Sequence, residues 1–148
     1  MFSYSKIAIV GILFMAGICF SCNAPSTNGK ARIMELMSIQ EQQWNTGDIP
    51  GFMETAYIKS DSLYFVGKSG LNTGYKRTLD NYLKSYPSLD QMGKLHFTNE
   101  VFKSLGTDHY LVIGAWELRR FQDTIGGYYS LVWENINGDW KIIADHSS

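Results

Sequence analysis

The second half of this chain constrains its fold most strongly, because almost every residue after Gly93 falls into segments with the composition of β-strands. These segments are residues 95–105, 109–121, 128–135 and 140–146. Turn-forming residues separate them at Gly106-Thr107-Asp108, Gly126-Gly127 and Asn137-Gly138. Asn-Gly is the strongest short-range hairpin signal, since both positions accept a positive φ. The pattern therefore predicts an antiparallel sheet whose strands follow one another in a meander.

The first half instead shows apolar residues at helical spacing in residues 31–44, 48–57 and 75–86. Asp48 is expected to cap the second helix, with Pro50 in its first turn, and Pro87 ends the third. One short strand is expected at residues 63–66, followed by a turn at 67–70. Helices first and hairpin-linked strands afterwards indicate an α+β domain with helices packed on one face of a curved sheet.

The amino terminus has the layout of a secretory signal peptide, because Lys6 is followed by residues 7–20 without a charged side chain. That run is too short for a comfortable membrane span of about 20 residues. The stretch Cys19-Phe20-Ser21-Cys22 resembles a bacterial lipobox, in which a small residue precedes the acylated cysteine. We therefore expect a lipoprotein signal peptide at 1–21, the lipidated Cys22 with a flexible linker at 22–30, and one domain at 31–148.

The lipid on Cys22 would hold the domain on a membrane of the bacterial cell envelope, facing the periplasm or the cell surface. A retained, uncleaved signal anchor is the alternative.

Composition excludes several classes of function for the domain. Both cysteines lie before residue 23, so the domain has no thiol for catalysis, disulfides or zinc ligation. Removal of Lys6 leaves 12 of the 13 Lys and Arg side chains against 14 acidic ones, which does not suit nucleic acid. His96, His109 and His146 have no metal-type spacing, and no helix follows Gly126-Gly127 to form a phosphate loop. We expect no metal, nucleotide or other cofactor.

The order of elements and several local motifs resemble the nuclear transport factor 2-like superfamily, in particular its SnoaL-like and domain-of-unknown-function 4440 members. The residues that carry the resemblance are Trp44-Asn45-x-Gly47-Asp48, Tyr57, Phe65-Val66, Met92-Gly93-x-Leu95-x-Phe97, Gly114-x-Trp116 and the ending 140–148. The resemblance implies a cone: three N-terminal helices on a curved, mainly antiparallel sheet, with a cavity at the wide end. Some members, such as ketosteroid isomerase and polyketide cyclases, are enzymes, and others bind ligands or only oligomerise.

A ligand cavity is expected between Trp44, Tyr57, Trp116, Trp133 and His146. Trp116 and Trp133 share the apolar phase of their predicted strands, and His146 has the phase of Trp140, Ile142 and Ala144, which places it on the apolar side of the sheet. A hydrogen-bonded core histidine is the alternative for His146.

Gly114 either leaves room for a ligand beside Trp116 or lets the sheet curl. Three acids, Asp61, Glu117 and Asp145, are available as a general base, and the sequence distinguishes none of them. Asp145-His146-Ser147 cannot form a nucleophilic triad, because adjacent strand residues point to opposite faces.

Two functions remain open. One is a lipid-anchored module that binds a small, partly apolar ligand or serves in oligomerisation, which we favour; the other is a small-molecule isomerase, cyclase or dehydratase. An isolated carboxylate opposite a Tyr or His donor in a dry cavity would favour the enzyme. Leu111 and Ile113 make the second face of residues 109–121 apolar as well, so we expect a homodimer through the strands between Leu95 and Asn135.

Overall fold

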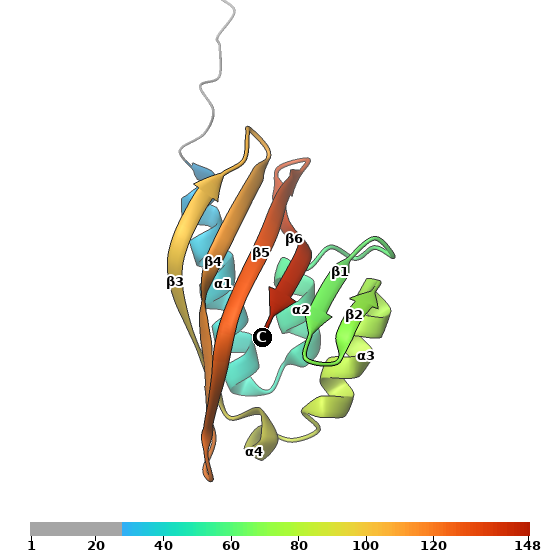
Figure 1. Cartoon of the computed structure of the whole chain (residues 1–148), viewed down its shortest axis with the longest axis vertical. Helices are drawn as coiled ribbons and strands as arrows, with labels where there is room; N and C mark the ends of the chain where they lie inside the picture. The colour runs from blue at the N-terminus through green and yellow to red at the C-terminus, as the bar shows by residue number, and fades with distance from the viewer. Residues whose placement is uncertain (1–27) are drawn as a thin grey trace, which may run out of the picture.

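The computed structural model describes residues 28–148 (Figure 1). The predicted signal peptide, Cys22 and the linker up to residue 27 lie outside the described residues. The first helix, α1 (Asn28–Thr46), begins three residues before the predicted start, so residues 28–30 belong to the helix and not to the linker.

The other helices are α2 (Ile49–Ala56), α3 (Tyr75–Ser85) and the short α4 (Leu89–Met92). The Asp48 carboxylate accepts a hydrogen bond from the Gly51 amide at 2.9 Å, and Pro50 lies in the first turn of α2, as predicted. The sequence analysis missed α4, because a segment of four residues is too short to show a helical period.

The strands are β1 (Tyr64–Gly67), β2 (Gly70–Thr73), β3 (Lys94–Ser104), β4 (His109–Arg119), β5 (Thr124–Ile136) and β6 (Asp139–Ser147). They form one sheet in the order β2-β1-β6-β5-β4-β3, and every neighbouring pair is antiparallel except the parallel pair β1 and β6. The predicted meander of β3 to β6 and the α+β class are confirmed. β2 was missed: its first residue, Gly70, was interpreted as part of a turn, and residues 71–73 were assigned to no element.

The turn between β4 and β5 was predicted in the wrong place. Gly126 and Gly127 lie inside β5, and the chain reverses at residues 120–123, where Arg120 and Asp123 form an ion pair at 2.6 Å. Gly126 is needed for a close approach instead, since a Cβ there would lie 2.6 Å from the Trp116 carbonyl oxygen. The Asn137-Gly138 turn is confirmed, with φ of 55° and 97°.

A β-bulge in β6 decides which side chains reach the inside of the molecule. Val132 pairs with Ala144 and Trp133 with Ile142, so Ile143 is an extra residue with no partner on β5. An extra residue reverses the alternation of faces beyond it. As a result Asp145 is buried on the inner face with 4% of its surface exposed, and His146 is exposed on the outer face. The prediction that His146 lies on the apolar side of the sheet is therefore wrong.

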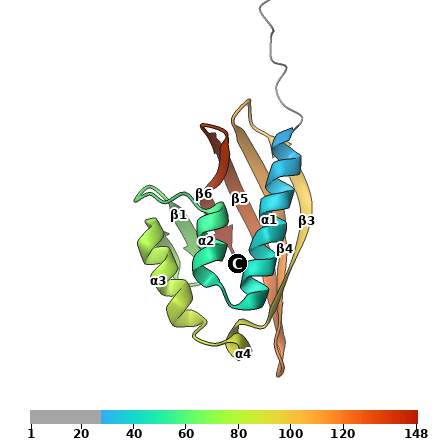
Figure 2. The same cartoon turned by 180° about the vertical axis from the view of Figure 1, so that it is seen from behind.

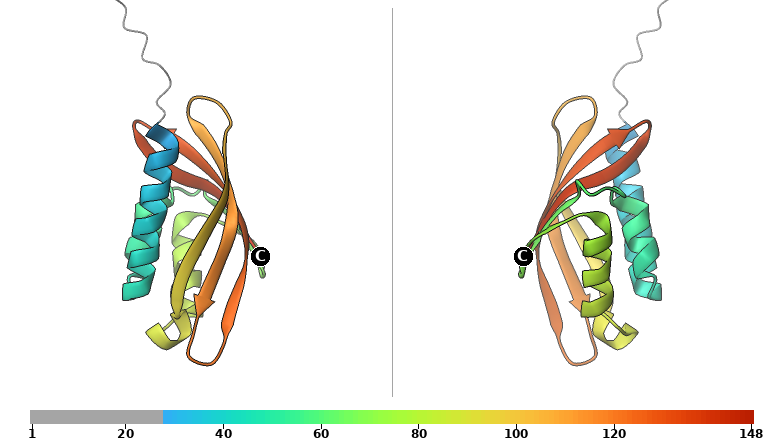
Figure 3. Two further views of the ribbon diagram at one scale, coloured as in Figure 1. Left: turned by 90° about the vertical axis from the view of Figure 1, so that its left-hand side faces the viewer. Right: turned by 90° about the vertical axis from the view of Figure 1, so that its right-hand side faces the viewer.

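The helices cover one face of the curved sheet, as the side views and the rear view show (Figures 2 and 3). The core lies between this face and α1 and α2, and includes Ile33, Met37, Met53, Leu63, Val112, Trp133 and Ile142. In residues 28–148 no helix combines the length and the apolar composition needed to cross a bilayer.

Candidate functional site

A cavity of about 870 Å³ lies between the inner face of the sheet and the helices. Its walls are mainly aromatic: Trp44, Phe52, Tyr57, Phe65, Tyr82, Tyr86, Phe97, Trp116 and Tyr129. The most exposed lining residues are Lys68, Ser69, Asn81, Ser85, Gly126 and Ser148. The size and the ring-rich walls are those of a pocket for a small organic molecule.

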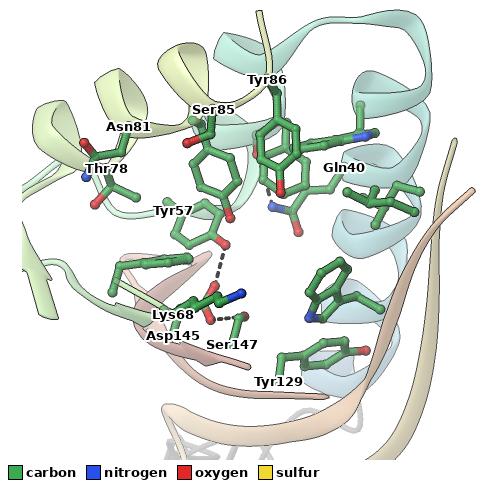
Figure 4. Close-up of a pocket in the computed structure, with 18 of the residues that line it drawn as sticks. Gln40, Tyr57, Lys68, Thr78, Asn81, Ser85, Tyr86, Tyr129, Asp145 and Ser147 are labelled. Atoms are coloured by element: carbon green, nitrogen blue, oxygen red, sulfur yellow. Dashed lines mark hydrogen bonds between the residues drawn. The ribbon is translucent and has the colours of Figure 1, made fainter. Parts of the chain in front are cut away.

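Asp145 of β6 places a buried carboxylate in the wall of this cavity (Figure 4). The Tyr57 hydroxyl donates to its Oδ2 at 2.6 Å, and the Ser147 hydroxyl donates to its Oδ1 at 2.6 Å. Burial raises the pKa of Asp145 to about 6, although both hydrogen bonds and the nearby His146 act in the opposite direction. Among the described residues, no Lys, Arg or His side chain forms a salt bridge with this carboxylate. Asp145 is thus a buried acid held by neutral donors alone.

Tyr57 is held in place by the backbone on both sides. It is the C-cap of α2, where its amide donates to the Met53 carbonyl at 2.9 Å, and it forms an isolated bridge with Ile142 of β6. Burial raises the pKa of Tyr57 and of Tyr82 on α3 well above that of a free tyrosine, and the Asp145 charge adds to this. Both phenols therefore stay neutral near pH 7 and can donate hydrogen bonds.

Gln40 of α1 supplies a second acceptor on the opposite wall. Its amide nitrogen donates to the Phe52 carbonyl at 3.1 Å, which fixes the orientation of the amide. Only 2% of Gln40 is exposed to solvent, and Figure 4 shows its amide pointing into the cavity. Within residues 28–148 its oxygen accepts no hydrogen bond, so a bound molecule can use it.

Several of the remaining polar side chains of the lining already have hydrogen-bond partners. Asn81 donates to Asn72 at 2.9 Å, and the Tyr129 hydroxyl donates to Asn99 at 2.8 Å. Among the described residues the indole N–H of Trp116 has no hydrogen-bond partner, and this atom is buried. Asp145 and Gln40 are deeply buried acceptors of the lining that keep capacity for a ligand.

The structure brings three of the five expected cavity residues together. Trp44, Tyr57 and Trp116 line the cavity, whereas Trp133 and His146 do not. Trp133 is on the inner face but is fully buried in the core, where its strand partner Tyr110 packs against Gly29 of α1. His146 is on the outer face because of the β6 bulge.

The sequence analysis did not single out the polar centre of the site. Asp145 was considered only as one of three acids, and Gln40 was not considered. Neither had a recognisable signal: the bulge that turns Asp145 inward depends on pairing with β5, and Gln40 looks like any polar residue on a helix. In residues 28–148 no group of three or more His, Cys, Asp or Glu side chains is arranged to hold a metal ion.

The fold and the cavity define a class of small cone-shaped α+β proteins, and solved structures with this architecture are numerous. A nuclear transport factor 2-like protein of unknown function from Shewanella oneidensis is 34% identical, with a TM-score of 0.77 over 80% of this chain and 98% of the other. The chain therefore belongs to the nuclear transport factor 2-like superfamily.

Two more distant structures share the fold alone. A ketosteroid isomerase-like protein from Erwinia carotovora is 16% identical, with a TM-score of 0.61 over 80% of this chain and 93% of the other. A putative scytalone dehydratase from Novosphingobium aromaticivorans is 11% identical, with a TM-score of 0.66 over 80% and 81%. No protein-family model and no curated protein sequence matches this chain.

Proposed function

We propose that this protein binds a small, partly apolar organic molecule in the cavity, and that a lipid on Cys22 tethers it to the bacterial cell envelope. The observation that carries the proposal is a ring-lined cavity of about 870 Å³ with a buried acceptor, Asp145, in its wall. Ring walls bind an apolar body without restricting its identity, while a buried acceptor orients one polar group.

The hydrogen bonding of Asp145 favours binding over acid–base catalysis. An isomerase of the ketosteroid type needs a carboxylate base and a separate donor that stabilises the developing oxyanion. Here the Tyr57 hydroxyl is bonded directly to Asp145, so the nearest donor serves the carboxylate itself. The hydrogen-bonded pair of Tyr57 and Asp145 is therefore better suited to bind a polar group of a ligand than to transfer a proton.

α1, where the described residues begin, starts at the top of Figure 1, whereas the β1–β2 turn, the end of α3 and the start of β5, which carry exposed lining residues, lie in its lower half. A domain anchored through Cys22 would present this side of the cavity away from the membrane, where dissolved molecules can enter.

Ligand-dependent thermal stabilisation in a broad metabolite screen tests the proposal. Trp116→Ala should abolish the shift, because a ring wall is lost, and Asp145→Asn should change which compounds give one. His146→Gln is the matched control, since its neighbour Asp145 lines the cavity and His146 does not. The absence of any shift, or shifts that survive Trp116→Ala and Asp145→Asn unchanged, would contradict the proposal.

The second candidate is a proton-transfer enzyme of the isomerase, cyclase or dehydratase type. It is favoured by one observation: burial raises the pKa of Asp145 to about 6. A general base is most efficient when its pKa lies near the pH at which the enzyme works. Deuterium exchange next to the carbonyl group of small cyclic ketones in heavy water would test it. Exchange that Asp145→Asn abolishes and Asp139→Asn, at an exposed site on β6, leaves unchanged would establish this function instead.

A further inference from the structure

The described residues that line the cavity include one buried acidic side chain and no buried basic side chain. Of the lining residues, all of which lie in the described part of the chain, only Asp145 and Lys68 carry charged side chains. Lys68 is an exposed residue of the β1–β2 turn and forms no salt bridge with Asp145. A buried carboxylate without a cationic partner is costly, and a ligand that supplies the cation removes that cost.

The neutral partners of Asp145 leave acceptor capacity for such a ligand. Oδ2 of Asp145 accepts one hydrogen bond from Tyr57, and Oδ1 accepts one from Ser147. An ionised carboxylate can accept about four hydrogen bonds, so positions remain for a ligand. The free amide oxygen of Gln40 also points into the cavity (Figure 4). Two acceptors in one cavity match a group that has several donors and no acceptor, as an ammonium has.

The walls around this acceptor are also suited to a cation. Tyr82 packs against Phe65 with ring centroids 5.7 Å apart and against Phe52 at the same 5.7 Å, and Phe52 in turn lies 6.0 Å from the ring of Tyr57. Aromatic faces attract an organic cation through their quadrupole and pack equally well against an apolar body. An anionic ligand would instead be repelled by the negative charge of Asp145.

We propose that the cavity selects organic cations, namely protonated amines on an aromatic or alicyclic body, with the nitrogen held by Asp145 and the body packed against the rings. This inference rests on the proposed binding function and names its ligand class. A neutral donor such as an alcohol can form one of these hydrogen bonds, but it leaves the buried charge without compensation.

The test compares matched probes by calorimetric titration of the full-length protein. Each of a set of aromatic and alicyclic scaffolds is offered in three forms: primary amine, alcohol and carboxylate. The amine should bind at least about tenfold more tightly than the alcohol, and the carboxylate most weakly. Asp145→Asn should remove this preference by weakening the amine about tenfold while leaving the alcohol within about twofold. Asp139→Asn, the same change at an exposed site on β6, should alter neither.

Three results would overturn the inference. Equal affinity for amine and alcohol would leave the binding function intact but show that charge does not select the ligand. Preferred binding of carboxylates, lost in Lys68→Gln, would show that the lysine at the β1–β2 turn sets the specificity. No binding by any scaffold in any form would remove both the inference and the proposed function.

Discussion

Replacement of Asp145 by Asn should stabilise the fold at neutral and alkaline pH. Burial raises the pKa of this carboxyl from 3.8 to about 6 in the folded state. A difference of that size corresponds to about 3 kcal/mol by which folding disfavours the ionised form. Because the folded state binds the proton more tightly, the contribution of Asp145 to stability is most favourable below about pH 4 and is lost as the pH rises through about 6.

Asparagine has nearly the same shape and carries no charge at any pH in this range. Its single carbonyl oxygen can accept from only one of Tyr57 and Ser147, so one hydrogen bond, worth about 1 kcal/mol, must rearrange or be lost. The net gain expected at about pH 8 is therefore about 1–2 kcal/mol, and it should disappear or change sign near pH 4.

Few other groups near Asp145 titrate over this range. Tyr57, Tyr82 and Tyr129 stay neutral, because burial raises the pKa of each phenol. The basic residues nearest to Asp145 are His146, which is adjacent in sequence but on the outer face, and Lys68, which lines the cavity from the β1–β2 turn. Acids elsewhere contribute equally to both proteins and cancel in the difference.

Urea unfolding of the wild type, Asp145→Asn and the exposed-site control Asp139→Asn, repeated between about pH 4 and 8, measures this difference. Asp139→Asn should show no comparable pH-dependent gain. The reasoning is refuted if Asp145→Asn is less stable than the wild type at about pH 8, or if the difference does not vary with pH. The first outcome would mean that Tyr57 and Ser147 stabilise the ionised carboxylate more than burial disfavours it, and the second that the two effects balance.

Three further predictions concern the sheet and the anchor. Gly114→Ala should cost about 1–3 kcal/mol in urea unfolding, because its Cβ would collide with the Thr98 carbonyl and the Tyr129 hydroxyl; unchanged stability would show that β3 and β4 can separate. Ile113→Glu should convert a homodimer formed through the outer face of the sheet into monomers in light scattering, because it would bury an unpaired charge, and a monomeric wild type would contradict this. Mass spectrometry of the membrane fraction should find a diacylated or triacylated Cys22, and Cys22→Ser should give precursor or soluble protein; an unmodified Cys22 with its leader intact would contradict lipid anchoring.

Interactions within a few residues of the chain were predictable from the sequence. The Asp48 cap of α2 needs only an acceptor three residues before the Gly51 amide, and the Asn137-Gly138 turn needs only two residues that tolerate positive φ. Helical spacing located α1 and α3 for the same reason, since the period of the helix is local. These elements determined the α+β class and, with the motifs, the superfamily.

Pairing between strands decided the rest. Gly126 forms part of β5 because the Trp116 carbonyl of the neighbouring strand lies against it, although its sequence is typical of a turn. The extra residue Ile143 moves Asp145 inside and His146 outside, and it is defined only by the register of β6 against β5. A shift of one residue exchanges the two faces of a strand, and register is set by contacts distant in sequence. The sequence therefore determined that a ring-lined cavity would form, while the tertiary structure determined which titratable group it contains.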